Sequence, residues 1–509
     1  MPSYSDSHNL PTGGVLTATG LKSLDPAQWS ERIWVDGQWR SGGGGQHPIV
    51  SPATGEQLGK IGFASPADVD ASAESAMAAQ REWAARSYKD RAAVLRRAGD
   101  VWTAHSAEIV GWLERESGSA TAKAEHEVAT AAEECYEAAA LAAVPYGDVL
   151  RSAQPRLSIS RRLPVGLVAV IAPFNAPIVL SIRAVAPALA LGNAVLLKPD
   201  SRTTVSGGVT LAAVFEEAGL PKGLLQMLPG RGADVGERLI TTPHTRVIAF
   251  TGSTGAGRRV GELAAHHLKR AHLELGGNNA LIVLEDADLE HAPSVGAMGS
   301  FIHQGQICMV TGRQLVHESI ADEYVAKLAE RAQALTVGDP AGSRPVQLGP
   351  LIDQTQRDRV DSIVRDTVSA GAELKAGGTF DGLFYRPTVL DHVRPGHRAF
   401  REEIFGPVAP ITRFATLDEA IELACDTEYG LSLGILTGDV LRGLELADRI
   451  PSGNVHINDQ TVNDEVPVPF GGVGDSGTGS RHGGHQSNLE AFTELQWVTM
   501  RSELPRYPF

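Results

Sequence analysis

Cysteine is scarce in this sequence. Only three occur among 509 residues, at positions 135, 308 and 425. They lie far apart and none forms a CxxC pair, so we expect neither a disulfide framework nor a cysteine-based metal site. A lone cysteine is most often a small buried hydrophobe. Each of the three therefore has to be judged by its neighbours.

Long hydrophobic runs and excess positive charge are also missing. The longest apolar runs, such as 165–172, have strand length and fall short of the roughly 20 residues that would cross a bilayer. The net charge of -15 argues against a nucleic-acid backbone as partner. Residues 1–24 are polar and lack a basic stretch followed by an apolar one. We predict a cytoplasmic protein with no membrane and no nucleic-acid partner.

The chain length, and the change along the sequence from a helical pattern to alternating strand and helix patterns, predict several α/β domains. A chain of 509 residues exceeds what one hydrophobic core usually supports. Residues 66–143 are alanine-rich with charges at helical spacing, which indicates long amphipathic helices. Strand and helix patterns then alternate from 167 to 270, ending in an expected helix over 255–270. This alternation predicts a doubly wound, Rossmann-like parallel sheet.

A second α/β series follows from 280 to 484, and residues 491–500 alternate like a strand that pairs outside its own domain. An oligomer would supply that partner, and we expect a homodimer or homotetramer. The expected boundaries are a flexible segment over 1–28, a first α/β domain over 29–146 and 164–275, a second over 276–484, and a small β oligomerisation arm over 147–163 and 485–509.

Three segments carry residues suited to catalysis. Cys308 follows Gly305 on a predicted tight loop, where an exposed thiol can share the loop's backbone N–H groups with an oxyanion. Glu274 ends a predicted strand beside two glycines and is a candidate general base. Asn175, between two prolines, presents an amide that can donate to an oxyanion. Each has a purely structural alternative, and their joint presence favours catalysis.

These residues resemble the signatures of the aldehyde dehydrogenase superfamily from about Trp34 to Val498. The resemblance implies an NAD(P)-binding first domain and a catalytic second domain. It also implies that the Cys308 thiolate attacks the aldehyde carbon, that Asn175 and the Cys308 N–H hold the oxyanion, and that Glu274 activates the water that hydrolyses the thioester. The matching segments, in chain order, are PFNAP (173–177), Lys198-Pro199, GLPKG (219–223), FTGSTGAG (250–257), ELGG (274–277), GQxC (305–308), EEIFGPV (402–408) and PFGG (469–472).

The resemblance also implies a set of cofactor contacts. Ser253 at a helix N-terminus would meet the diphosphate, Lys198 the adenosine ribose, and Glu403 with Phe405 the nicotinamide ribose and ring. The full expected set is Ala172, Pro173, Phe174, Lys198, Ser201, Arg202, Gly232, Phe250, Thr251, Gly252, Ser253, Glu274, Leu275, Gly276, Glu403 and Phe405.

One departure from the family pattern bears on the choice between NAD and NADP. NAD-preferring members usually carry a Glu three positions after the lysine, and this chain has Ser201 followed by Arg202. Losing the carboxylate removes repulsion toward a 2'-phosphate, and Arg202 could pair with that phosphate. We therefore predict tolerance of NADP as well as NAD. The alternative is that Arg202 points to solvent and NAD dominates.

Other departures point to a branch of the family. Phe174 replaces a common Trp, Asn278 a Lys, and Gly474 a Lys. The segments HQGQICM (303–309) and ELGGNNA (274–280) are similar to those of benzaldehyde and vanillin dehydrogenases, so the resemblance implies an aromatic aldehyde. The expected substrate pocket is Val179, Arg183, Ile307, Met309 and Phe470.

Several alternatives remain open at this point. Arg183 either binds a polar ring substituent or caps the following helix, and we favour the structural role. A pocket for an aliphatic aldehyde or a semialdehyde would look similar. An acyl transfer to coenzyme A is disfavoured by Glu274, and a retired enzyme kept as a structural protein is disfavoured because no catalytic residue is lost.

Overall fold

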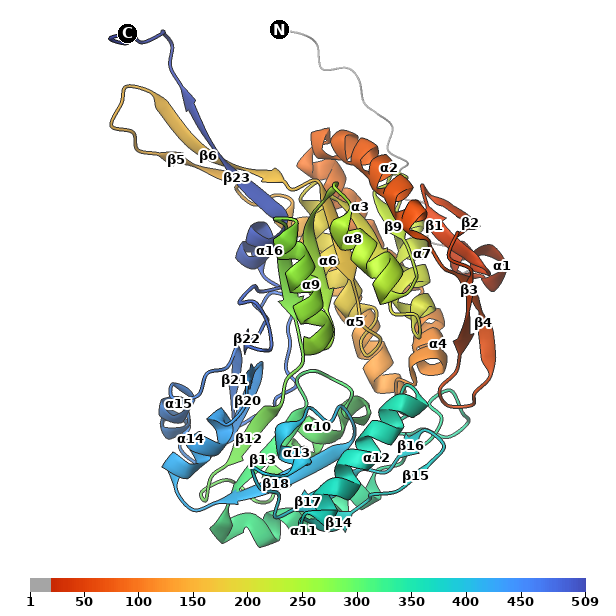
Figure 1. Ribbon diagram of the computed structural model, residues 1–509, viewed down its shortest axis with the longest axis vertical. Helices are drawn as coiled ribbons and strands as arrows, with labels where there is room; N and C mark the ends of the chain where they lie inside the picture. The colour runs from red at the N-terminus through yellow and green to blue at the C-terminus, as the bar shows by residue number, and fades with distance from the viewer. Residues whose placement is uncertain (1–19) are drawn as a thin grey trace.

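The structure, a computed structural model, describes residues 20–509. The first domain is built on a seven-stranded sheet in the order β11-β10-β7-β8-β9-β1-β2 (Figure 1). The five strands from β11 to β9 are parallel, and β1 joins β9 antiparallel. This is the doubly wound, Rossmann-like order expected from the sequence. The strands are β1 (Arg32–Val35), β2 (Gln38–Ser41), β7 (Leu167–Ile171), β8 (Ala194–Lys198), β9 (Leu225–Met227), β10 (Thr245–Thr251) and β11 (Arg270–Glu274).

Helices cover this sheet. The expected helical region over 66–143 is confirmed as four helices, the first of which starts with a capping box between Ser65 and Asp68. The expected helix over 255–270 is too long, because α9 ends at His266 and Leu268 has a φ of 54°. The chain then pairs with β10 from Arg270 onward. The helices are α1 (Pro26–Trp29), α2 (Pro66–Ala85), α3 (Tyr88–Ala104), α4 (Ser106–Ser117), α5 (Thr121–Leu141), α6 (Val179–Ala190), α7 (Thr210–Glu217), α8 (Glu237–Thr241) and α9 (Thr254–His266).

The second domain has its own seven-stranded sheet, in the order β14-β17-β18-β13-β12-β20-β21, which is parallel apart from β14 (Figure 1). Two buried apolar clusters lie in this domain. Its strands are β12 (Asn279–Val283), β13 (Thr311–His317), β14 (Glu373–Ala376), β17 (Thr388–Asp391), β18 (Val408–Phe414), β20 (Ser432–Leu436) and β21 (Asn454–Ile457). Its helices are α10 (Ala292–Phe301), α11 (Glu318–Ala334), α12 (Gln354–Ser369), α13 (Arg398–Arg401), α14 (Leu417–Cys425) and α15 (Val440–Ala447).

Short elements complete the fold. Residues Val205–Val209 and Gly232–Gly236 are single π-helical turns that precede α7 and α8, and Lys22–Leu24 and Ile302–Gly305 are 3-10 turns. Three small antiparallel pairs connect the larger elements. They are β3 (Gln46–Val50) with β4 (Gln57–Gly62), β15 (Phe380–Asp381) with β16 (Phe384–Tyr385), and β19 (Tyr429–Gly430) with β22 (Val473–Gly474).

A three-stranded arm projects from the first domain (Figure 1). It consists of β5 (Gly147–Leu150), β6 (Leu157–Pro164) and β23 (Thr493–Met500), with β23 and β6 in register from Thr493↔Pro164 to Met500↔Leu157. The expected arm boundary at residue 485 is wrong. Residues His485–Phe492 form α16, and its last residue, Phe492, is buried in the core of the first domain. Local alternation of apolar residues did not separate this short helix from the strand that follows it.

Part of the expected flexible segment over 1–28 is packed. Residues 1–19 lie outside the described residues. In the remainder, Leu21 and Leu24 are buried, and the Leu21 N–H donates to Glu108 at 3.0 Å. The expectation was wrong for this stretch because two leucines are enough to anchor it. Within residues 20–509 no helix is both long and apolar enough to cross a membrane.

Candidate active site

The carboxyl ends of four parallel strands meet at one edge of the first sheet. Ile171 at the end of β7 pairs with Lys198 on β8 and with Phe250 on β10, and Thr251 pairs with Glu274 on β11. The strand order reverses at β7, since β8 and β10 lie on its two sides. In doubly wound sheets, ligands bind outside the carboxyl ends of the strands at this reversal. The segments after these strands are therefore placed to form a binding crevice.

The amino ends of the second sheet meet this crevice. Residues 275–278 lead directly from β11 into β12, and Cys308 lies on the loop just before β13. Glu403 and Phe405 lie just before β18. The two catalytic candidates Cys308 and Glu274 thus come from two domains, and the polypeptide brings them together where the two sheets face each other.

The backbone of the nucleophile loop is strongly constrained. His303, Gln304 and Gly305 have φ angles of 49°, 54° and 69°. A Cβ at Gly305 would lie 2.0 Å from the Gly406 carbonyl oxygen, so only glycine fits there. The Gln304 side chain donates to the Gly118 and Pro350 carbonyls at 3.1 and 3.0 Å. The expected tight loop is confirmed, and these contacts fix its path.

The Cys308 thiol lies in an acidic, mostly dry environment. Burial, followed by the nearby carboxylates Glu403 and Glu274, raises its pKa to about 12. Its side chain packs with an apolar cluster that includes Met309 and Phe470. The thiol is therefore protonated at neutral pH in the free protein, and attack on a carbonyl requires a base that removes its proton.

Glu274 is buried at the end of β11, as expected. Within residues 20–509, neither of its carboxylate oxygens has a hydrogen-bond partner. Burial raises its pKa well above the ordinary value, although the cations Arg183 and Arg481 act in the opposite direction. A buried carboxyl without hydrogen bonds and with a raised pKa is suited to proton transfer.

Asn175 follows β7 in the PFNAP segment and is buried. Its backbone carbonyl accepts a hydrogen bond from Lys123 Nζ at 2.9 Å. In the described part of the chain, neither the Asn175 side-chain amide nor the Cys308 backbone N–H takes part in a hydrogen bond. Both donors remain available for an oxyanion.

The expected cofactor residues lie around the crevice. Ser253 is the N-cap of α9, and Gly252 precedes it directly after β10. Lys198 at the end of β8 is buried, which lowers its pKa. Ala172, Pro173 and Phe174 follow β7, Phe250 and Thr251 end β10, Leu275 and Gly276 follow β11, and Gly232 begins the turn before α8. Loops at strand ends and a helix N-terminus suit a dinucleotide.

Glu403 packs directly against the backbone after β11. Its Oε1 accepts from the Gly277 N–H at 3.2 Å, and a Cβ at Gly276 would lie 2.3 Å from its Oε2. Burial raises its pKa to about 7. Phe405, two residues on, contacts Phe174 edge to face with ring centroids 5.9 Å apart. These two expected nicotinamide contacts therefore reach the same crevice as the residues after β7 and β11.

Arg202 is engaged by the protein itself. Its guanidinium pairs with Asp200 at 2.9 Å and with Asp353 at 2.8 Å, and it lies 4.1 Å from the centroid of the Phe174 ring. Asp353 is the N-cap of α12 in the second domain, so Arg202 links the two domains. It does not point freely to solvent. Ser201, the other residue of this expectation, follows β8 at the crevice.

Three of the predicted pocket residues pack with the thiol. Met309, Phe470 and Ile307 pack in one cluster with Cys308, together with Leu431 and Val462, which the sequence did not single out. Val179 begins α6. A partly apolar wall next to a nucleophile is suited to an aldehyde with a hydrophobic body.

Arg183 lies at this cluster and does not cap a helix, so the favoured structural role as a cap was wrong. It sits within α6, pairs with Asp464, and lies 3.9 Å from Glu134. Its guanidinium stacks 5.4 Å from the centroid of Phe470. Its Nε is buried without a hydrogen-bond partner in the described chain. The guanidinium is thus held at the apolar cluster by two carboxylates.

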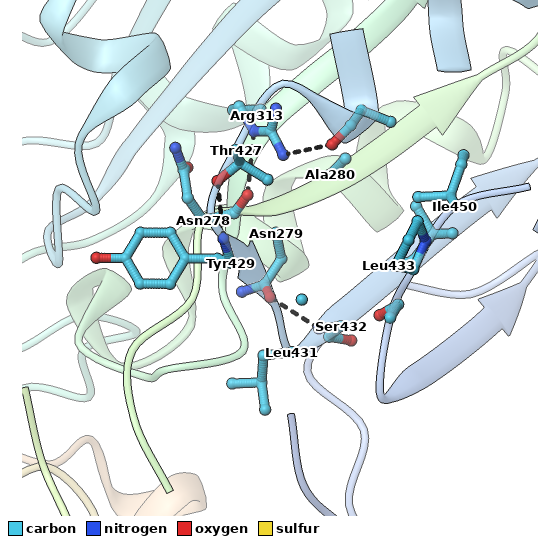
Figure 2. Close-up of a pocket in the computed structure, with 14 residues that line it drawn as sticks. Asn278, Asn279, Ala280, Arg313, Thr427, Tyr429, Leu431, Ser432, Leu433 and Ile450 are labelled. Atoms are coloured by element: carbon cyan, nitrogen blue, oxygen red, sulfur yellow. Dashed lines mark hydrogen bonds between the residues drawn. The ribbon is translucent and has the colours of Figure 1, made fainter. Parts of the chain in front are cut away.

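A small cavity of about 20 Å³ lies next to Asn279 (Figure 2). Asn278, Arg313, Tyr429 and Ser432 also line it. Figure 2 shows Asn279 directed toward Ser432. Cys308 does not line this cavity, but Leu431, a member of the apolar cluster at Cys308, does. Among residues 20–509 no group of three metal-ligating side chains is close enough to hold a metal ion.

Sequence reasoning missed several residues near the site. Asn279 lies inside the ELGGNNA motif, so its position was marked, but its partners were not. His303 likewise lies inside the segment HQGQICM, and its role was not recognised. The others belong to segments with no recognised motif. They are Lys123, Glu127, Glu134, Leu431, Val462, Asp464 and Arg481.

The crevice, thiol, buried carboxyl and oxyanion donors together define a thiol-dependent oxidoreductase with a dinucleotide site. The pattern of the aldehyde dehydrogenase family matches residues 39–498, and the chain belongs to this family. It is an oxidoreductase that acts on the aldehyde group.

Relatives and solved structures agree with this assignment. The vanillin dehydrogenase of Amycolatopsis sp. is 61% identical over 489 residues, covering 96% of this chain and 100% of that protein. The NAD(+) benzaldehyde dehydrogenase of Pseudomonas putida is 48% identical, covering 94% and 98%. The crystal structure of a salicylaldehyde dehydrogenase from Pseudomonas putida G7 with salicylaldehyde has a TM-score of 0.90 at 34% identity, covering 94% and 99%. A betaine aldehyde dehydrogenase from Staphylococcus aureus with NAD+ has a TM-score of 0.91 at 27% identity, covering 96% and 98%.

Proposed function

We propose that this chain oxidises an aromatic aldehyde, of the benzaldehyde or vanillin kind, to the carboxylic acid with NAD as the hydride acceptor. The observation that carries the proposal is the apolar cluster at Cys308, in which Phe470 supplies an aromatic face and Arg183 lies over that ring. Relatives named for vanillin, benzaldehyde and salicylaldehyde support the same substrate class.

The residues of the site account for each step on the protein. Cys308 gives its thiol proton to a solvent base and attacks the carbonyl carbon, and Asn175 with the Cys308 N–H stabilises the oxyanion of the thiohemiacetal. When bound, NAD accepts the hydride that leaves this carbon. The product on the enzyme is a thioester. Glu274 accepts a proton from the water that hydrolyses it, and within residues 20–509 neither of its oxygens has a hydrogen-bond partner that would compete with that water.

Arg183 supports a preference for rings with polar substituents. Its charge is held at the cluster by Asp464 and Glu134, and its Nε has no partner within residues 20–509. A hydroxyl or carbonyl oxygen on a substrate ring that reaches the guanidinium beside Phe470 would accept a hydrogen bond from it, whereas an alkyl chain would not. We therefore propose that the oxygen-bearing ring of vanillin is bound more tightly than an alkyl chain of similar size.

The test measures reduced cofactor with benzaldehyde, vanillin, hexanal and a dicarboxylic semialdehyde. We expect kcat/KM for the aromatic aldehydes to exceed that for the others by about tenfold or more, the discrimination that a pocket of this kind supplies. The reverse ranking would support the aliphatic or semialdehyde alternative. Cys308→Ala should abolish turnover, while Cys425→Ala, which changes an exposed cysteine on α14, should retain it. A folded protein inactive with every aldehyde would favour the retired-enzyme alternative.

We propose that NADP is also accepted, because Ser201 stands where NAD-preferring family members usually carry a glutamate, whose carboxylate would repel a 2'-phosphate. This proposal rests on Ser201 alone, since Arg202 is paired with Asp200 and Asp353. The other proposed cofactor contacts are unchanged. They are Ala172, Pro173, Phe174, Lys198, Gly232, Phe250, Thr251, Gly252, Ser253, Leu275, Gly276, Glu403 and Phe405.

We also propose that the arm joins subunits of a homodimer or homotetramer. Leu150, Leu495 and Trp497 share one face of its strands and are 42%, 62% and 64% exposed, and a face of this kind is normally covered by a partner. Light scattering after gel filtration measures the mass, and a monomer would contradict the proposal. A cytoplasmic location stays a prediction, which cell fractionation would test.

A further inference from the structure

Helix α5 presents a buried ion pair to the segment that carries Asn175. Lys123 and Glu127 are one helical turn apart, and their side chains are 11% and 2% exposed. Buried charges are costly unless every hydrogen-bonding group is satisfied. The partners of this pair therefore indicate what holds it in place.

All three protons of the Lys123 ammonium have acceptors. They are the Glu127 carboxylate, the Ser119 hydroxyl at 3.1 Å and the backbone carbonyl of Asn175 at 2.9 Å. A lysine offers three donors, so none is left over. One of the three is used to hold the backbone of the proposed oxyanion donor.

Glu127 holds the other end of the same segment. Its Oε1 accepts from the backbone N–H groups of Ile178 and Val179 at 2.8 and 3.3 Å. These are donors at the start of α6, which have no partner within the helix, and a carboxylate there also interacts favourably with the helix dipole. Residues 175–179 are thus tied to α5 at both ends by one ion pair.

The pair also borders the segment that leads to the nucleophile. His303 is buried against the backbone of Asn175, and burial together with the Lys123 cation lowers its pKa well below the ordinary value. His303 is therefore neutral, and it is the first residue of the strained loop before Cys308. Lys123 consequently lies near both this loop and the segment that carries Asn175.

We propose that Lys123 and Glu127 are positioning residues that set the Asn175 amide relative to Cys308. The proposal rests on the proposed role of Asn175 as oxyanion donor. An oxyanion donor is effective when it is already in place, and a shift of about 1 Å costs on the order of 100-fold in rate. Neither residue touches the substrate; both act through the backbone on either side of Asn175.

The first test compares Lys123→Met with Lys327→Met. Lys327 is a matched control, because it also pairs with a glutamate one helical turn away and donates to a backbone carbonyl, at 3.2 Å, but lies on α11. The readout is the single-turnover rate of reduced-cofactor formation. We expect Lys123→Met to lower it by roughly tenfold to 100-fold, with NAD affinity unchanged, and Lys327→Met to leave it unchanged. An unchanged rate in folded Lys123→Met overturns the proposal.

A double variant separates positioning from a general structural role. If Lys123 acts through Asn175, Lys123→Met adds no further loss to Asn175→Ala, whereas independent effects multiply. Multiplying losses overturn the proposal. A full rate in Asn175→Ala instead contradicts the proposed function, so the two failures are distinguishable. Should Lys123→Met not fold, Glu127→Gln, which keeps an acceptor oxygen, is compared in the same way, and an unchanged rate again overturns the proposal.

Discussion

The side chain of Asn279 holds the backbone of Cys308. Its Nδ2 donates to the Cys308 carbonyl at 2.9 Å and to the Val310 carbonyl at 2.8 Å, and its oxygen accepts from the Ser432 N–H at 2.9 Å. Asn279 is the first residue of β12 and Ser432 the first of β20. One amide therefore joins the nucleophile loop to two strands of the second sheet, and the position of the sulfur is set by that sheet.

Replacing Asn279 by alanine should lower both stability and activity. The change leaves two carbonyls and one N–H unpaired at a buried site, so we expect the free energy of unfolding to fall by about 2 to 4 kcal/mol. The freed loop should lower kcat by roughly tenfold or more. Urea unfolding and aldehyde turnover measure the two effects. Wild-type kcat in the variant would show that the loop holds its position without this amide.

Glu274→Gln should separate acylation of Cys308 from hydrolysis of the thioester. Acylation does not need the carboxylate, so we expect a burst of reduced cofactor close to one per site, followed by a steady rate lowered by about 100-fold or more. Stopped-flow absorbance measures both phases. Loss of the burst together with the steady rate would instead place Glu274 in the attack by Cys308.

The pH dependence of the same step follows from the raised pKa of Glu274. The base acts when ionised, so the rate of thioester hydrolysis should rise with pH as Glu274 loses its proton, with a midpoint above that of an ordinary carboxyl. The acidic limb should vanish in Glu274→Gln. A wild-type profile that is flat from pH 5 to 8 would contradict this role.

Glu116 should make folding stability depend on pH. It is fully buried on α4 and accepts from the Val205 and Ser206 N–H groups at 2.8 and 2.6 Å, yet burial raises its pKa from 4.5 to about 7. As pH rises, Glu116 ionises in the unfolded chain before it ionises in the folded protein. Its contribution to the free energy of unfolding is therefore complete below about pH 4.5 and is lost as pH rises through about 7.

Glu116→Gln should therefore flatten the stability profile. Between pH 5 and 8 we expect the wild-type free energy of unfolding to fall by up to about 3 kcal/mol more than that of the variant. Urea unfolding at each pH measures the difference, with exposed Glu262→Gln as the control. Parallel profiles for wild type and Glu116→Gln would show that Glu116 is ionised throughout.

Ser201→Glu should shift the cofactor preference toward NAD. The new carboxylate would repel a 2'-phosphate and could accept from a 2'-hydroxyl, so kcat/KM with NADP should fall by about tenfold or more while that with NAD is kept. Steady-state rates with both cofactors decide this. If the wild type already rejects NADP, the expected tolerance is wrong.

Much of the fold follows from local patterns. The alternation of strands and helices expected from residue 167 is observed from β7 to β11, because a fully buried parallel strand and an amphipathic helix have different periodicities. The errors in the expected bounds lie at the ends of helices and strands. α9 ends at His266 because Leu268 adopts a left-handed conformation. α16 forms before β23 because Phe492 is buried in the core of the first domain. Such choices depend on packing partners distant in sequence.

The sequence by itself determined the two-domain α/β fold and marked Cys308, Glu274 and Asn175, because motifs at strand ends and tight loops impose requirements that neighbouring residues reveal. Only the tertiary structure decided that Arg202 is paired, that Arg183 lies over Phe470 in the apolar cluster at Cys308, and that Lys123 reaches a carbonyl 52 positions away. In sequence, Lys123 and Glu127 on an alanine-rich helix look like a solvated pair. Burial against another segment, which no local pattern encodes, instead binds that pair to the backbone of residues 175–179.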